Sequence, residues 1–110
     1  MANLVPKSFY LGNTTGSNVY TVANTVGNYS IIKSINICNT SNTANATADI
    51  YILVGAAAAG AGNKIISNAV VIKDDVLYYN TAIVIPANSK IYVASSNSSL
   101  TFNISGVEYA

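Results

Sequence analysis

Several short motifs in this chain of 110 residues carry side chains that could support catalysis. Ser30-Ile31-Ile32-Lys33 has the Ser-x-x-Lys spacing of penicillin-recognising acyl-enzymes, in which the serine is the nucleophile. That chemistry needs both side chains on one face, which a helix provides at this spacing and a strand does not. The segment is rich in β-branched residues and is predicted to be a strand. The partner motifs Ser-Asp-Asn and Lys-Thr-Gly are absent from the sequence, so acyl transfer is not indicated.

A second motif, Gly55-x-x-x-x-Gly60, matches the beginning of a phosphate-binding loop. Such a loop needs Lys and then Ser or Thr directly after the second glycine, because these side chains contact the phosphates and the magnesium ion. Here Ala61 follows the second glycine and Lys64 comes three residues too late. The sequence therefore predicts no nucleotide site.

The acidic pair Asp74-Asp75 could supply a carboxylate of a glycosidase or a calcium ligand. Adjacent residues of a strand point to opposite faces, and the other acids are only Asp49 and Glu108. We interpret the pair as a solvated turn. The chain has no His, and Cys38 is its one cysteine, which excludes a His-based triad and a zinc site of the usual nitrogen and sulfur type. The sequence predicts no enzyme activity, no cofactor and no metal.

Charge and composition narrow the classes of partner. Hydrophobic residues make up 51% of the chain and charged residues 8%, with a net charge of +1 and no Arg. Nothing here would attract nucleic acid. The polar residues are mostly Asn, Ser and Thr, which favour turns and exposed strand faces. Low charge is tolerated best by a protein that packs against something. An AT-rich coding sequence is the alternative explanation for the many Asn residues.

Two segments and the single cysteine predict the cellular compartment of the protein. Met1–Ser8 lacks the basic and apolar regions of a signal peptide, so we expect no secretion. The longest apolar stretch, Ile50–Ala61, contains two glycines and is shorter than the roughly 20 residues of a membrane-spanning helix. Cys38 alone cannot form an internal disulfide, which fits a reducing cytoplasm. We expect assembly in the cytoplasm and no membrane partner.

The positions of the apolar residues predict an all-β protein. Short runs rich in Ile, Val, Tyr and Thr alternate with clusters of Gly, Asn, Ser and Pro. This pattern favours a single β-sandwich or jelly-roll-like domain over residues 1–110, with about eight or nine short antiparallel strands. The strand segments are predicted at Ser8–Leu11, Asn18–Ala23, Tyr29–Cys38, Ala46–Val54, Lys64–Ile66, Val70–Lys73, Val76–Tyr79, Ala82–Ile85, Lys90–Ala94 and Leu100–Val107.

The alternation within these runs also predicts the core and the turns. In the fourth run, Ile52 and Val54 are expected on the core face and Leu53 on the other. Turns are predicted at Pro86–Ser89 and in a hairpin at Ser95–Ser99, and Gly55–Gly62 is predicted to be a mobile loop. The predicted core consists of Ile35, Ile37, Ile50, Ile52, Ile91, Val93, Leu100, Phe102 and Ile104.

Two stretches carry a resemblance to a known group of proteins. One is Ile35-Asn36-Ile37-Cys38-Asn39-Thr40-Ser41 with Asp49–Val54; the other runs from Ile83 to Ala94 and closes with Ile104-Ser105-Gly106-Val107-Glu108. The chain resembles the small β-sandwich proteins of tailed-bacteriophage virions, found as capsid decoration, head-fibre, neck or tail-associated subunits. Its turn Pro86-Ala87-Asn88-Ser89 departs from the Ala-Gly-Asp expected there. The resemblance implies a non-enzymatic virion component that associates with itself or cements other subunits, such as the major capsid protein.

Candidate contact residues lie in three segments. Residues 1–11 are predicted to be an N-terminal arm, too short and irregular for a secure strand, that pairs across subunits. The strand edges carry few charged residues that would prevent pairing with another chain, and this scarcity also favours association. The tyrosine pair Tyr78-Tyr79 could instead stack on sugars, so a carbohydrate- or receptor-binding module with a surface glycan as ligand remains the alternative, followed by a small enzyme or inhibitor domain. The predicted interface residues are Phe9, Tyr10, Leu11, Ala57, Ala58, Tyr78 and Tyr79.

Overall fold

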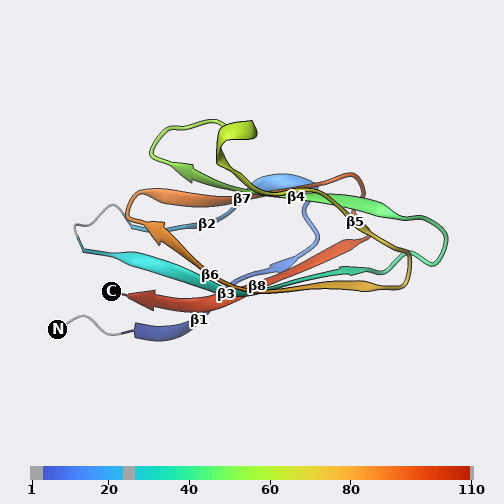
Figure 1. Ribbon diagram of the computed structural model, residues 1–110, viewed down its shortest axis with the longest axis horizontal. Helices are drawn as coiled ribbons and strands as arrows, with labels where there is room; N and C mark the ends of the chain where they lie inside the picture. Colours follow the sequence, from blue (N-terminus) through green and yellow to red (C-terminus); the bar gives the residue numbers. More distant parts are fainter. Residues whose placement is uncertain (1–3, 24–26, 110) are drawn as a thin grey trace.

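Two antiparallel sheets of four strands each pack face to face in the computed structural model, which describes residues 4–23 and 27–109 (Figure 1). No helix in these two ranges is long and apolar enough to cross a membrane. The elements are β1 (Leu4–Gly12), β2 (Gly16–Thr21), β3 (Tyr29–Asn39), β4 (Ala46–Val54), the 3₁₀ helix η1 (Ala61–Asn63), β5 (Lys64–Val71), β6 (Val76–Pro86), β7 (Ser89–Ser95) and β8 (Leu100–Tyr109).

The strand order is that of a jelly roll. The first sheet has the order β1-β8-β3-β6 and the second the order β2-β7-β4-β5. The pairs β1–β8, β2–β7, β3–β6 and β4–β5 are therefore nested in the sequence, as in one long hairpin that has been rolled up. The all-β prediction is confirmed, and the topology selects the jelly roll from the two architectures that the sequence left open.

One turn prediction is corrected by this topology and another is confirmed. β7 and β8 lie in different sheets, so Ser95–Ser99 joins the two sheets and does not close a hairpin. Pro86–Ser89 is a turn, as predicted, and it also connects the two sheets, from β6 to β7. Alternation along a strand determines which face is buried, but it does not determine which strand becomes the neighbour. That choice depends on contacts that are distant in sequence.

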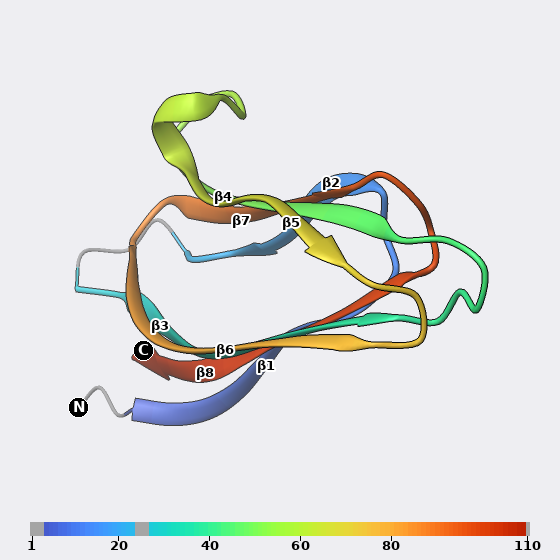
Figure 2. The same ribbon diagram turned by 45° about the vertical axis from the view of Figure 1, so that its right-hand side comes forward.

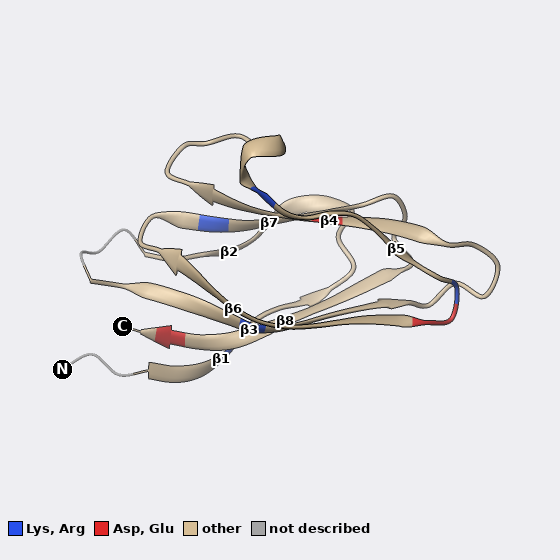
Figure 3. Ribbon diagram, in the orientation of Figure 1, with Lys and Arg blue, Asp and Glu red and all other residues tan. Residues whose placement is uncertain are grey.

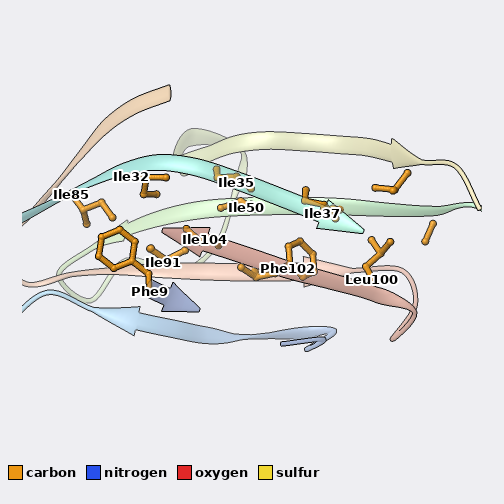
Figure 4. Close-up of a cluster of buried hydrophobic side chains, with 14 of the residues drawn as sticks. Phe9, Ile32, Ile35, Ile37, Ile50, Ile85, Ile91, Leu100, Phe102 and Ile104 are labelled. Atoms are coloured by element: carbon orange, nitrogen blue, oxygen red, sulfur yellow. The ribbon is translucent and has the colours of Figure 1, made fainter. Parts of the chain in front are cut away.

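The core fills the space between the sheets (Figure 4). The predicted core residues are fully buried there, except Ile52, which is half-buried at the margin. Leu53 is buried as well, although it lies outside the core cluster, and Val54 is 58% exposed. The connection from β4 to β5, with η1, rises on the outer side of the second sheet (Figure 2), and Leu53 lies next to the end of β4, where this connection begins. Pairing with Ile91 and Lys90 of β7 puts Ile52 on the core face and Leu53 on the outer face, as predicted, so only the burial of the residues at the end of β4 differs from the expectation.

Every edge strand contains a β-bulge. The register shifts by an extra residue at Phe9 in β1 and at Val19 in β2. β5 shifts around Asn68, whose φ is 48°, and β6 shifts between Asn80 and Ile83. Bulges twist an edge and interrupt its row of hydrogen-bonding groups, which hinders pairing with another chain. The edges have few charges, as predicted, but their irregular shape protects them.

The N-terminal segment is a regular part of the first sheet and not a free arm. Leu4–Gly12 pairs along β8, and residues 1–3 lie outside the described part of the chain. The bulge turns two consecutive side chains inward, so that Phe9 is 6% exposed in the core and Tyr10 packs against it. The predicted strand Ser8–Leu11 covers only part of β1, because the bulge breaks the period of two on which the prediction relies.

Candidate functional site

The outward side of the first sheet, which we call face A, is the first candidate surface. Register places outward residues in rows across the four strands. The rings of Tyr29 and Tyr109 stack with centroids 4.8 Å apart and an interplanar angle of 14°. From one end of the sheet to the other, the first four rows are Leu4, Tyr109, Tyr29 and Pro86; Pro6, Val107, Ile31 and Val84; Ser8, Ser105, Ser34 and Asn80; and Leu11, Asn103, Asn36 and Tyr78.

Face A is apolar at one end and almost without charge. Leu4 is 53% exposed and Val84 59% exposed at the apolar end, and Leu11 and Tyr78 are similarly exposed in the fourth row. An antiparallel sheet usually presents polar residues on its solvent side. Among the described residues, Lys33 is the one charged side chain on this face, and Figure 3 shows that most of the first sheet carries no charged residue. Such a surface is typical of a protein contact.

Only two of the seven predicted interface residues come together. Leu11 and Tyr78 share the fourth row of face A, on opposite edge strands. Phe9 is in the core, so it cannot serve as a surface contact, and Tyr10 and Tyr79 are half-buried against the core. Ala57 and Ala58 are exposed in the connection from β4 to β5, on the other side of the molecule.

The outward side of the second sheet, which we call face B, presents aromatic and charged side chains. Its central row is formed by Asn18, Tyr92, Tyr51 and Lys64. The two tyrosine rings meet edge to face with centroids 5.6 Å apart. The Lys64 ammonium lies 5.4 Å from the centre of the Tyr51 ring and 3.4 Å from a carboxylate oxygen of Asp49. This arrangement offers a partial aromatic platform beside a carboxylate and an ammonium group.

A polar cluster lines a cleft of about 250 Å³ at the edge of the sandwich formed by β1, β8 and β2. The Tyr20 hydroxyl donates a hydrogen bond to the Glu108 carboxylate and lies 3.0 Å from the Ser30 hydroxyl. Lys7 is 3.9 Å from the same carboxylate. Burial, and then the hydrogen bond with Glu108, raises the pKa of Tyr20 to about 12. The phenol therefore stays protonated and links β2 to the first sheet.

Sequence reasoning missed this cluster, and no local signal could have found it. Tyr20 and Glu108 are 88 residues apart, and only the nested pairing of the strands brings them together. Within the described ranges, no three His, Cys, Asp or Glu side chains gather in a way that could hold a metal ion. A scan against protein-family models, a search of curated proteins and a search of solved structures each found no match to the chain.

Proposed function

We propose that this protein is a non-enzymatic structural subunit of a tailed-bacteriophage particle, most simply a capsid decoration or cement subunit that stabilises the particle through protein contacts. The observation that carries the proposal is face A. Its exposed apolar rows include Leu4 and Val84, and a face of this kind is stabilised when another protein covers it.

Charge and fold support the same role. A net charge of +1 opposes close packing very little. The jelly roll occurs in viral capsid domains, although it also occurs in lectins and cupins, so the fold alone does not decide between them. The resemblance of Ile35–Ser41 and Ile83–Ala94 to small virion proteins favours the particle.

The test is co-purification with particles. Virions would be banded in a density gradient from a host that produces them, and the chain detected by antibody and mass spectrometry. We expect the chain in the particle band, and we expect Val84→Glu, on face A, to reduce its amount there. Val70→Glu is the matched control, because Val70 is 53% exposed on face B. Absence of the wild-type chain from purified particles would contradict the proposal.

A second candidate function, a carbohydrate-binding module, is favoured by face B. Tyr51 and Tyr92 offer ring surface to a pyranose, and Asp49 and Lys64 could bind its hydroxyl groups. A glycan array probed with the full chain tests this function. Binding should be lost in Tyr92→Ala and kept in Tyr78→Ala, which removes a tyrosine from face A. Binding that survives Tyr92→Ala would remove this candidate.

A further inference from the structure

The proposed function does not say which protein covers face A. The face is continuous across all four strands, and its rows run without a gap from Leu4 at one end to Tyr78 near the other. Its exposed apolar side chains are therefore not isolated. They belong to one surface built from cross-strand rows, and the face of one sheet can pack against the face of another.

The edges of the molecule are poor sites for association by comparison. β1 and β6 border the first sheet, and both contain bulges. β2 and β5 border the second sheet and contain bulges as well. Extension of either sheet by a strand from another chain would have to accommodate these irregular registers. Face-to-face packing avoids that difficulty, since it uses side chains and not the main chain.

We propose that face A packs against face A of a second copy of this chain. A symmetric dimer brings each surface against itself, so a charged face would oppose its own charges. Face A avoids this problem, because Lys33 is its one charged residue among those the structure describes. The long side chain of Lys33 can keep its ammonium group in water at the border of the contact. A partner of opposite charge has little on this face to recognise.

The area of face A fits a reversible dimer. Four strands at about 4.8 Å spacing and about nine residues at about 3.4 Å give a surface of roughly 600 Å² on each copy. The total of roughly 1,200 Å² is at the lower limit for specific interfaces. We therefore expect a dissociation constant on the order of 1–100 µM. The pairing would leave both copies of face B, with Tyr51 and Tyr92, on the outside of the dimer.

This inference rests on the proposed structural role, but dimer formation is measured in solution without virus particles, so that failure of the dimer and failure of particle binding are separate results. Sedimentation of the full chain from about 1 to about 500 µM should show a monomer that becomes a dimer. Val84→Glu should raise the dissociation constant at least tenfold. Val70→Glu introduces the same charge at a similarly exposed valine of face B and should leave it unchanged.

Cys38 supplies a second measurement on the unmodified chain. It is exposed on face A, where its cross-strand neighbours are Val76 and Thr101. A maleimide should react with this thiol more slowly at high protein concentration, and the protection should disappear in Val84→Glu. Circular dichroism checks that both valine variants are folded.

Three results would overturn the pairing. The first is a wild-type chain that stays monomeric at the highest concentration, with no protection of Cys38. The second is a dimer that Val84→Glu does not weaken, or that Val70→Glu weakens equally, because either result assigns the contact to another surface. The third is a monomer whose binding to particles is abolished by Val84→Glu, because that result assigns face A to a different protein.

Discussion

At the scale of single residues, Gly106 has no room for a side chain where β8 pairs with β3, next to a register shift between Ile32 and Ser34. A Cβ atom at this position would lie 1.9 Å from the carbonyl oxygen of Ile31, so the backbone would have to move. We expect Gly106→Ala to lower the free energy of unfolding by about 3 kcal/mol. Gly60→Ala is the control, because nothing lies within 4 Å of its Cβ position and its φ of −167° suits any residue. Urea unfolding of both variants checks this, and equal stabilities would contradict it.

Asn39 is a buried residue whose hydrogen-bonding groups are all used. Its amide nitrogen donates to the carbonyl oxygens of Ala44 and Val71, and its side-chain oxygen accepts hydrogen bonds from the Ser41 amide and the Ser99 hydroxyl, each at 3.0 Å. The residue is 1% exposed. It therefore joins the end of β3 to the second sheet and to two connections.

Asn39→Asp should make stability depend on pH. The carboxylate would face two carbonyl oxygens in a buried site, which raises its folded-state pKa above the unfolded value of about 3.9. The protonated carboxyl group therefore stabilises the folded variant most below pH 3.9, and this stabilisation is lost as the pH rises through the folded-state pKa. At pH 7 we expect a loss of about 3 kcal/mol, measured by urea unfolding. In Asn97→Asp the exposed side-chain oxygen still accepts the Ser99 amide, and the change should be small. A loss in Asn39→Asp that is equal at pH 4 and pH 7 would show that charge is not its cause.

Tyr20 predicts a second pH effect, at the alkaline end. Its pKa of about 12 in the folded chain exceeds the ordinary value of 10, because it is partly buried beside Glu108. The folded state therefore holds the Tyr20 proton more tightly than the unfolded state does. This preference stabilises the folded state fully below pH 10, and the stabilisation is lost between pH 10 and 12.

Tyr20→Phe removes that contribution, together with the hydrogen bonds that the Tyr20 hydroxyl makes with Glu108 and Ser30. We expect the free energy of unfolding at pH 7 to fall by about 1–3 kcal/mol. The difference in the free energy of unfolding between the variant and the wild type should shrink as the pH rises from 10 to 12. Denaturant unfolding at each pH measures this difference. Parallel curves over that range would contradict the role of the Tyr20 proton.

At the scale of elements, β1 is part of the folded core. Phe9 is buried, and its ring lies 4.5 Å, centroid to centroid, from Tyr20 of β2. Deletion of residues 1–12 would remove this contact and leave β8 as an unpaired edge. We expect loss of cooperative thermal unfolding, the opposite of what a dispensable arm would give. Deletion of residues 1–3 is the control and should leave the melting temperature within about 2 °C of the wild type. A stable fold after the longer deletion would contradict the place of β1.

The elements also show how far sequence alone could predict this protein. Leu100, Phe102 and Ile104 alternate without a break, so their burial was predictable. Phe9 was missed because a bulge breaks the alternation in β1, and Leu53 was missed because it is buried although alternation puts it on the outer face. Of the interface residues, Leu11 and Tyr78 were found as exposed apolar residues. That they share one row depends on register, which no local pattern contains.

At the scale of the whole molecule, the residues that we expect to mediate association are different from those that stabilise the fold. Residues that face the core come from every strand, whereas the outward rows of face A contribute little to the packing between sheets. A substitution such as Val84→Glu should therefore change assembly and leave stability nearly unchanged, since exposed positions usually contribute within about 0.5 kcal/mol. Thermal unfolding of the variant at low protein concentration checks this separation. A large fall in its melting temperature would mean that face A also supports the fold.

The pairing of β1 with β8 means that the chain could be circularly permuted. Leu4 and Tyr109 are cross-strand partners, so the first and last described residues lie side by side (Figure 1). Joining residue 110 directly to residue 1 would turn β8 and β1 into an ordinary hairpin, and new ends could be opened between Ala57 and Ala58, both exposed. This circular permutant should adopt the same eight-stranded fold. It should also fold faster, because the most distant strand pair in the sequence would become the nearest.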